Sequence, residues 1–430
     1  MTAAIYTLGC RVNQYESEAI AEALSREGII VCPPEQTCDA YIINTCTVTA
    51  ESARKARQFI RRAIKASPGA FILVTGCYSQ TSRDEVAAIE GVDYVCGSSN
   101  KMSVVPALLA LREKGRKNAV PEICIPDGST ADFEKMSISS FGRTRAYLKI
   151  EDGCENKCAY CIIPRARGRV RSKDEDDVIS EIKALSESGY SEVVLTGIET
   201  AAYGRDNGSS LISLLERADG IENLRRIRLS SLDPSYVGKS FADFAANSRL
   251  LCPHFHLSLQ SGCDRTLAAM RRKYNTSQAE ENMARLREAM PDVNFTADII
   301  VGFPGESDED FEKTCEFVKR NPLLHGHIFS YSRREGTEAA DMPTQIPEKI
   351  KIERNRFLTE ICERTGRQIR GKYIGRRAEV LFESSDGSFF SGHTANFIEV
   401  KVKTDERLHS QYRDVIIKTD TLPCEAELTD

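Results

Sequence analysis

Three cysteines lie within eight residues, at Cys154, Cys158 and Cys161, in the segment 152–164. A glycine precedes the first cysteine and a proline follows the last, so this short loop can turn all three sulfur atoms toward one point. Clustered thiolates suit a soft metal centre such as an iron–sulfur cluster. Three ligands leave one iron of a four-iron cubane free to bind a substrate or cofactor. A structural zinc site needs a fourth Cys or His. Because no His occurs before His254, zinc is the weaker hypothesis unless a distant fourth ligand completes the site.

Length and composition limit the class of protein. The 430 residues suffice for two or three domains, and 58 Lys and Arg against 63 Asp and Glu give a net charge of −5. Any nucleic-acid partner must therefore be held by local patches. No secretory signal and no run of about 18 apolar residues is visible, so a cytosolic protein that enters no membrane is expected. Disulfides are rare in that compartment, and fifteen cysteines there indicate metal or redox chemistry.

A second group of cysteines follows from topology. In residues 1–100, apolar runs at 3–8, 41–44, 70–75 and 92–95 alternate with helical patterns, which predicts a parallel sheet. Cys10, Cys46 and Cys77 follow the first three of these strands, and ligands collect at the carboxyl ends of parallel strands. Each cysteine taken alone is more simply an inert loop residue, but three at equivalent strand ends indicate a second three-thiol site. Cys96 follows the fourth strand and is the rival ligand.

The rest of the chain predicts a connector and two further domains. Residues from about 101 to 140 have the Pro, Gly and Ser content of a connector. Six βα repeats then suit an α/β barrel, open or closed, with chemistry at the strand carboxyl ends. The strands are expected at 146–150, 192–196, 226–230, 254–259, 297–301 and 327–331. From about residue 368, short strands separated by turns predict a small antiparallel β-barrel, a type that often binds RNA.

Two other patterns allow more than one interpretation. Basic residues alternate with small ones in 165–173, so in an extended segment their five charges share one side. Binding of a cofactor carboxylate or a phosphate is favoured, and internal salt bridging with the acidic run 174–177 is the alternative. His254 and His256 have the spacing of one strand face, and a barrel-lining or packing role is favoured over metal binding.

The cysteine loop, with Tyr160 before its last cysteine, resembles the signature of radical S-adenosylmethionine enzymes. Five further segments make the chain similar to the methylthiotransferases of that superfamily. They are Thr7–Ser17, Asn44–Val48, Gly153–Gly168, Arg228–Pro234 and Pro253–Gly262. The form of residues 14–17 and 160–164 most resembles the tRNA enzymes that act on N6-threonylcarbamoyladenosine.

This resemblance implies an α/β fold with three domains. Residues 1–130 are expected to form the parallel-sheet methylthiotransferase domain, residues 140–367 a partial (β/α)6 barrel, and residues 368–430 an antiparallel barrel of the TRAM type. Cys154, Cys158 and Cys161 would hold a [4Fe-4S] cluster whose open iron binds S-adenosylmethionine, and reductive cleavage would give a 5′-deoxyadenosyl radical. Cys10, Cys46 and Cys77 match the ligands of an auxiliary [4Fe-4S] cluster that would hold the sulfur to be transferred.

The resemblance also implies cofactor contacts and partners. Tyr160 is expected near the adenine of S-adenosylmethionine, and Thr196, Gly197 and Glu199 near its amino group. Further candidates are Ser230, Gln260 and residues 302–306. The family often has Gly near position 201, where this chain has Ala201, so the substrate-facing side of that loop differs. The expected partners are tRNA and an electron donor such as flavodoxin or ferredoxin, with a monomeric enzyme.

The implied activity is transfer of a methylthio group to C2 of N6-threonylcarbamoyladenosine next to the anticodon of tRNA. Alternatives within the family are methylthiolation of isopentenyladenosine in tRNA or of a ribosomal-protein aspartate. An alternative of a different class is a non-catalytic iron–sulfur or zinc protein that binds RNA through its C-terminal barrel.

Overall fold

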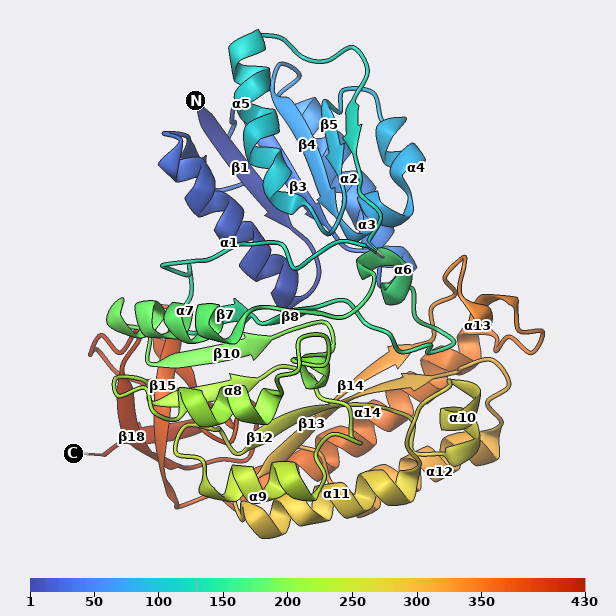
Figure 1. The fold of residues 1–430 in the computed structure, drawn as a ribbon. Coiled ribbons are helices and arrows are strands. Elements are labelled where there is room, and N and C mark those ends of the chain that lie inside the picture. The colour runs from blue at the N-terminus through green and yellow to red at the C-terminus, as the bar shows by residue number, and fades with distance from the viewer. Residues whose placement is uncertain (129, 430) are drawn as a thin grey trace.

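The computed structural model describes residues 1–128 and 130–429, and its N-terminal unit is built on a parallel sheet of six strands (Figure 1). The strand order is β2-β1-β3-β4-β5-β6. The strands are β1 (Thr2–Thr7), β2 (Ile30–Cys32), β3 (Ala40–Thr45), β4 (Phe71–Gly76), β5 (Tyr94–Cys96) and β6 (Glu122–Cys124). The central strand β3 is buried along its whole length, as expected for a parallel sheet covered on both faces.

Helices cover both faces of this sheet. Apolar side chains of α1 and α5 pack on one face, and those of α2 and α4 pack on the other. The helices are α1 (Arg11–Arg26), α2 (Ala50–Ala66), α3 (Cys77–Thr81), α4 (Arg83–Ala87) and α5 (Val104–Lys114). Strand β6 lies in the segment predicted as a connector. All three of its residues are exposed, so no buried face marks it in the sequence.

The central unit is a partial barrel made of two three-stranded parallel sheets, β11-β10-β7 and β12-β13-β14. Isolated bridges from Ile227 to Leu251 and from Leu232 to Leu257 join the sheets on the β11–β12 side. Strands β7 and β14 each end a sheet, so the barrel is open between them. The strands are β7 (Ala146–Lys149), β10 (Glu192–Thr196), β11 (Arg226–Leu229), β12 (His254–Gln260), β13 (Asn294–Val301) and β14 (His325–Ser330).

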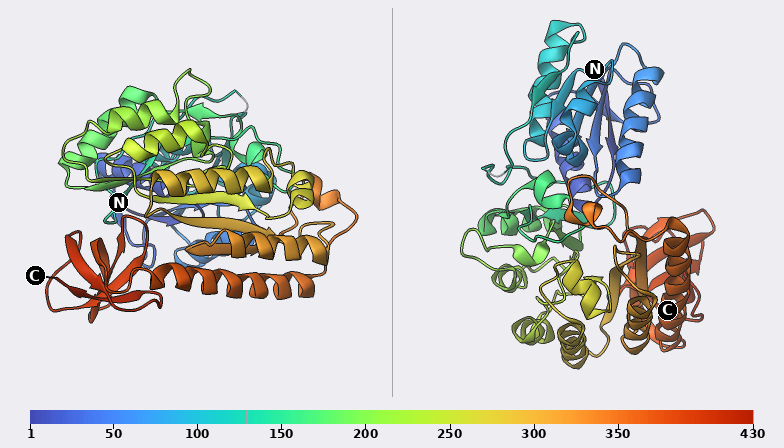
Figure 2. Two further views of the ribbon diagram at one scale, coloured as in Figure 1. Left: turned by 90° about the horizontal axis from the view of Figure 1, so that it is seen from below. Right: turned by 90° about the vertical axis from the view of Figure 1, so that its right-hand side faces the viewer.

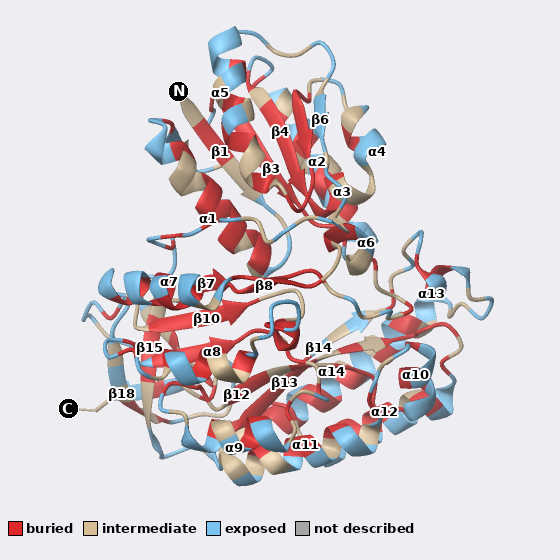
Figure 3. Cartoon of the chain, in the orientation of Figure 1, coloured by how far each residue is buried: buried red, intermediate tan, exposed pale blue. Residues whose placement is uncertain are grey.

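Helices surround the barrel on the outside (Figures 1 and 3), with buried inner faces and exposed outer faces. They are α7 (Glu175–Glu187), α8 (Leu211–Ala218), α9 (Lys239–Asn247), α10 (Asp264–Ala269), α11 (Thr276–Ala289), α12 (Asp308–Arg320) and α14 (Glu348–Gly371). Shorter elements lie near the cysteine loop. They are β8 (Glu151–Asp152), β9 (Arg171–Ser172), α6 (Ile163–Arg167) and α13 (Glu338–Asp341).

The C-terminal unit is a closed five-stranded barrel at the end of α14 (Figure 2). Its order is β15-β16-β17-β19-β18, and one pair, β17 with β19, is parallel rather than antiparallel. The strands are β15 (Arg377–Ser385), β16 (Phe389–Thr394), β17 (Glu399–Lys403), β18 (Tyr412–Ile417) and β19 (Cys424–Leu428). Arg226 and Arg228 of β11 reach this barrel, donating to backbone carbonyls of Glu379 and Ala395 over 3.1 and 3.2 Å. Within residues 1–128 and 130–429, every helix is too short or too polar to cross a lipid bilayer.

Candidate functional site: two groups of three cysteines

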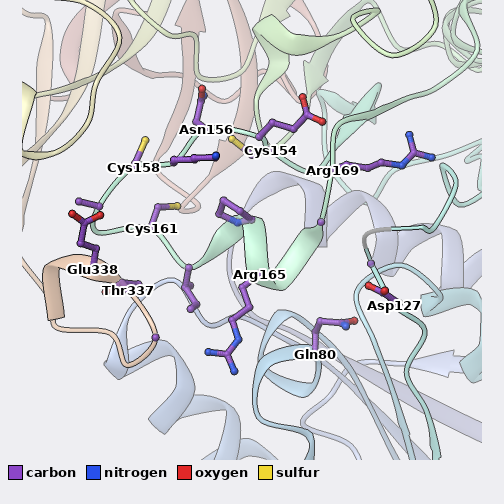
Figure 4. Close-up of a pocket in the computed structure, with 18 residues that line it drawn as sticks. Gln80, Asp127, Cys154, Asn156, Cys158, Cys161, Arg165, Arg169, Thr337 and Glu338 are labelled. Carbon is purple, nitrogen blue, oxygen red and sulfur yellow. The ribbon is translucent and has the colours of Figure 1, made fainter. Parts of the chain in front are cut away.

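Cys154, Cys158 and Cys161 line a cavity of about 750 Å³ above the barrel, a volume typical of small-molecule sites. Figure 4 shows the three sulfur atoms around one space, while Arg165 points away from them. All three cysteines are partly exposed. Gly153 sets the turn before Cys154, since its φ is +88° and a Cβ there would lie 1.8 Å from a backbone oxygen.

Burial keeps two of these thiols protonated in the absence of a metal. It raises the pKa of Cys154 to about 12 and that of Cys161 to about 11. A thiol must lose its proton to bind a metal, and a metal ion provides the energy for that loss. Three thiols facing one cavity therefore fit the ligand set of an iron–sulfur cluster with one open iron.

Cys10, Cys46 and Cys77 follow β1, β3 and β4, which are neighbours in the sheet. Their side chains lie close together, since Cys77 raises the pKa of both Cys10 and Cys46. Burial first, then Cys77 and Cys10, raise the pKa of Cys46 to about 11. Cys96 instead packs in the apolar layer beneath α5 and is fully buried. The strand ends thus bring the three predicted cysteines together and leave Cys96 apart.

Neither group has the geometry of a single-ion site. Among the residues that the structure describes, no three His, Cys, Asp or Glu side chains converge enough to hold one metal ion.

Arg167 joins the two groups of cysteines. Its side chain is fully buried, and its Nε donates a hydrogen bond to Sγ of Cys77 over 3.2 Å. Its Nη1 donates to Oε1 of Glu16 over 2.8 Å and to Oδ1 of Asp152 over 3.1 Å. Glu16 lies on α1 of the N-terminal unit, and Asp152 lies two residues before Cys154. One guanidinium therefore fixes the cysteine loop against the N-terminal sheet.

Cations outnumber carboxylates in the buried network around Arg167. The cations are Lys101, Lys149, Arg167 and Arg171, and the carboxylates are Glu16 and Asp152. Burial alone would raise the pKa of Glu16, but Arg167, Lys101 and Lys149 hold it well below its usual range. Buried charge is stable only next to opposite charge. The excess of cations beside Cys77 therefore favours a negatively charged ligand set there, such as thiolates bound to iron.

A second guanidinium contacts the cysteine loop. Nη1 of Arg272 donates to Sγ of Cys158 over 3.3 Å, and its Nη2 donates to Asp233 over 2.7 Å. Each group of cysteines thus has one thiol that accepts a hydrogen bond from an arginine anchored by a carboxylate. Hydrogen bonds to cluster sulfur atoms are among the features that set reduction potential.

The predicted cofactor contacts lie around this loop and the neighbouring strand ends. Asn156 donates to Oε2 of Glu199 over 3.1 Å, and burial together with Asp233 raises the pKa of Glu199 to about 7. Thr196 ends β10, Ser230 follows β11, and Gln260 ends β12 with a φ of +61°. A strained conformation of this kind persists where the surroundings fix it, often at functional sites.

Tyr160 is predicted near the cofactor adenine, and it lies in the loop between Cys158 and Cys161. Burial raises the pKa of its hydroxyl far above the ordinary value, while Arg272 opposes this. Residues 302–306 are predicted as further cofactor contacts, and one of them also stabilises the turn after β13. Oε2 of Glu306 accepts hydrogen bonds from N of Gly302 over 2.6 Å and from Arg354 of α14 over 2.6 Å.

The interpretation of the basic run 165–173 as one extended anion-binding face is wrong for most of its residues. Residues up to Arg167 form α6, so the five charges do not share one side. Three of them are buried in ion pairs: Arg167 with Glu16 and Asp152, Arg171 with Asp152, and Lys173 with Glu181. The alternative, salt bridging with residues 174–177, is also wrong for these three, because their partners are carboxylates elsewhere in the chain.

Sequence reasoning missed Arg272 and Glu151 as parts of the site, and it gave Arg167 a different role within the basic run. Oε2 of Glu151 accepts a hydrogen bond from N of Glu199 over 2.7 Å, while its buried Oε1 has no partner among the described residues. Burial raises the pKa of this carboxyl well above its usual range. Only the position of Glu151 at a strand end could have indicated it. Arg167 and Arg272 carry no local signal, since their partners are distant in sequence.

Two family models match separate parts of the chain, and each part contains one group of cysteines. A family model described as the Radical SAM superfamily matches residues 148–318, which include the cysteine loop. A second model, described as Uncharacterized protein family UPF0004, matches residues 2–97, which include the other three cysteines.

Three relatives match over most of their own length. Threonylcarbamoyladenosine tRNA methylthiotransferase MtaB of Bacillus subtilis is 39% identical over 94% of this chain and 91% of its own. The protein of the same name from Aquifex aeolicus is 36% identical over 93% of this chain and 96% of its own. The tRNA-2-methylthio-N(6)-dimethylallyladenosine synthase of Syntrophus aciditrophicus is 33% identical over 88% of this chain and 83% of its own.

Among solved structures, the radical S-adenosylmethionine methyltransferase TsrM from Kitasatospora setae has a similar fold. The TM-score is 0.59 at 16% identity, covering 79% of this chain and 76% of that one. The full-length relatives, the matched radical SAM region and the two groups of cysteines agree. The chain belongs to the methylthiotransferase family of radical S-adenosylmethionine enzymes.

Proposed function

We propose that this enzyme transfers a methylthio group to C2 of N6-threonylcarbamoyladenosine in tRNA. The observation that carries the proposal is the pair of three-cysteine groups on separate units, joined by Arg167 through Cys77 and Asp152. The substrate comes from the relatives named threonylcarbamoyladenosine tRNA methylthiotransferase, which are 36–39% identical to this chain.

In this proposal the loop cysteines Cys154, Cys158 and Cys161 hold a [4Fe-4S] cluster in the cavity. The cluster and S-adenosylmethionine, when bound and reduced, supply a radical that removes hydrogen from the substrate. Arg272 orients Cys158 by its hydrogen bond. Glu199, Thr196, Gly197 and the neighbouring Tyr160, Ser230 and Gln260 form the cofactor contacts.

Cys10, Cys46 and Cys77 are proposed to hold the second [4Fe-4S] cluster, which supplies the sulfur. Arg167 orients Cys77 and balances the charge of the ligand set. Since Arg167 also anchors Asp152, the same residue holds the cysteine loop against the second group of cysteines. We further propose a cytoplasmic monomer that receives electrons from a flavodoxin or ferredoxin.

The direct test is mass spectrometry of tRNA nucleosides from a strain that lacks the gene. We expect the methylthio form of N6-threonylcarbamoyladenosine to disappear and the unmethylthiolated nucleoside to accumulate. The intact gene should restore it, and a variant with Cys154, Cys158 and Cys161 changed to Ala should not. Unchanged nucleosides would contradict the proposal.

The same measurement separates the second candidate substrate. Relatives named as dimethylallyladenosine enzymes are 32–33% identical, somewhat less than the first group. Loss of the methylthio form of dimethylallyladenosine instead would assign the enzyme to that substrate. Anaerobic reconstitution should give about eight irons per chain, four for each cubane.

A further inference from the structure

The sheet β12-β13-β14 is covered on one face and open on the other. Toward the outer helices, Phe255, Phe295 and Ile299 are fully buried. Toward the barrel interior, His325 and His327 of β14 are exposed and Phe329 is 48% exposed. Parallel sheets are usually buried on both faces. The open inner face of β14 is therefore a surface available to a ligand.

Histidines gather on this inner face. The sequence has six, and five lie in one continuous group: His254, His256, His325, His327 and His393. The rings of His325 and His327 are 4.6 Å apart, and those of His256 and His327 are 5.4 Å apart. In the part of the chain that the structure describes, they form no site for a metal ion. Their rings instead provide flat aromatic area.

The aromatic surface continues into the C-terminal barrel. Phe397 stacks on His254 at 4.3 Å and on His393 at 4.7 Å between ring centroids. Guanidinium groups of Arg145 and Arg228 lie over the same Phe397 ring, at 5.7 and 4.9 Å. Phe397 is thus stacked on two imidazole rings and Arg228 is buried, so these contacts join two units of the fold beside the exposed histidines.

Arg11 of α1 lies at the opposite side of the opening, with its guanidinium 5.7 Å from the ring centroid of Tyr147 on β7. It lies within electrostatic range of His254 and His327. Within residues 1–128 and 130–429 no carboxylate forms an ion pair with it. An arginine in such surroundings is stabilised by an anion.

We propose that the surface formed by Arg11, His325, His327 and Phe329 binds the single-stranded RNA next to the modified adenosine. The inference rests on the proposed function and adds the surface that holds the substrate. Single-stranded RNA is bound by stacking of unpaired bases on aromatic rings and by cations that contact the backbone. This surface presents rings in a row, with a cation that has no carboxylate partner facing them.

The row of exposed rings along β14 runs toward the cysteines that take part in the proposed reaction. Successive side chains on one strand face are two residues apart, so His325 and Phe329 are separated by about 13 Å along β14. Phe329 is near the carboxyl end of the strand, and Oγ of Ser332 accepts a weak hydrogen bond from N of Ala50 over 3.4 Å. Ala50 begins α2, shortly after Cys46. The row therefore leads from the C-terminal barrel toward the N-terminal cysteines.

The first test concerns stacking. Affinity of the reconstituted enzyme for a fluorescent anticodon stem–loop is measured for the wild type, H327A, F329A and H327F. Each alanine variant should bind about tenfold more weakly, because one stacked base contributes roughly 1–3 kcal/mol. H327F should bind like the wild type, since it keeps an aromatic ring. F357A is the matched control, because Phe357 is 51% exposed but lies on the outer helix α14.

The second test concerns the backbone contact. The affinity is measured at several salt concentrations, and the logarithm of affinity is plotted against the logarithm of salt concentration. R11Q should make this slope shallower by about 0.7, the value for the loss of one phosphate contact on a single strand. The reduction should be the same for stem–loops with and without the threonylcarbamoyl group. A loss restricted to the modified stem–loop would move the contact to the carboxylate of that group and overturn the phosphate assignment.

Two outcomes separate this inference from the proposed function. Wild-type affinity in H327A, F329A and R11Q, with methylthiolation intact in the wild type, would overturn the surface but leave the function standing. Weaker binding in these variants, in a protein that produces no methylthiolated nucleoside, would support the surface and overturn the function. Iron content and S-adenosylmethionine cleavage should stay at wild-type levels in the H327A and F329A variants.

Discussion

The two groups of cysteines are built in different ways. Cys154, Cys158 and Cys161 lie on one loop of eight residues, and their proximity follows from local spacing. Cys10, Cys46 and Cys77 are separated by 36 and 31 residues and meet only because β1, β3 and β4 are adjacent. The proximity of the first three sulfur atoms depends on the conformation of one loop, and that of the second three depends on the order and register of the strands in the sheet.

This difference also appears in their surroundings. The loop group is partly exposed along a cavity of about 750 Å³, whereas Cys46 and Cys77 are buried beside a network with excess positive charge. An open cavity suits a cofactor that must enter and leave. A buried, positively charged environment suits a group that remains bound. The two regions share one component, Arg167.

The largest expected effect comes from removing one cysteine of each group. C158A should abolish S-adenosylmethionine cleavage and methylthiolation, because the radical originates at the loop. C77A should abolish methylthiolation but retain substantial cleavage. Each variant should lose about four of the eight irons. Cleavage is measured as 5′-deoxyadenosine release under dithionite. Loss of cleavage in C77A, with four irons retained, would contradict the division of roles.

Arg167 tests the connection between the regions. R167Q removes a buried cation that pairs with both Glu16 and Asp152. Breaking a buried pair costs about 3–5 kcal/mol, and the cost is smaller here because lysine and arginine partners of both carboxylates remain. The iron-free chain should therefore unfold at lower urea concentration. R169Q is the matched control, since Arg169 makes only a surface contact of 3.4 Å with Asp132 and should change stability by less than about 1 kcal/mol. Equal urea midpoints for the two variants would show that Arg167 does not join the regions.

These contacts explain what the sequence could and could not predict. Strand-end logic placed Cys10, Cys46 and Cys77 together because the alternation of strands and helices is strong. The prediction of an extended anion-binding segment at 165–173 is wrong. Alternating basic and small residues predict a strand, but the first of them belong to the short helix α6, which begins next to Pro164. Arg167 pairs with Glu16 across 151 positions. No local pattern encodes a contact of that length, so the link between the sites needed the structure.

Glycines before the cysteines allow a finer comparison. Gly153 has a φ of +88° and Gly76 a φ of +105°, and in both a Cβ would lie within 2.4 Å of backbone oxygen. G153A should distort only the cysteine loop and lower the iron content of the cluster held by that loop. G76A should lower the iron content of the second cluster, because it displaces the ligand Cys77. We expect each to cost about 1–3 kcal/mol. G189A is the control, since Gly189 also has positive φ but open space around it.

Low pH should destabilise the contact between the N-terminal unit and the cysteine loop, because Glu16 becomes protonated. Its folded pKa is well below the usual range, so its contribution to stability is complete above the unfolded value near pH 4.3 and is lost as pH falls through the folded pKa. The stability difference between wild type and E16Q should therefore be constant from pH 7 to about 5 and shrink below about pH 4. Urea unfolding of the iron-free chain at each pH measures it. A difference that is unchanged down to pH 3 would contradict this sign.

The smallest effect is expected from Cys96, which follows a strand as the other three cysteines do but faces another layer. It ends β5, is fully buried with Leu73, Val104 and Leu108, and burial raises its pKa to about 11. C96A should keep all eight irons and full methylthiolation, and should lose only about 1 kcal/mol as a small packing defect. Because successive strand residues point to opposite faces, a strand-end position alone does not make a ligand. Loss of iron in C96A would show that side-chain direction is the wrong criterion and would make Cys96 a ligand after all.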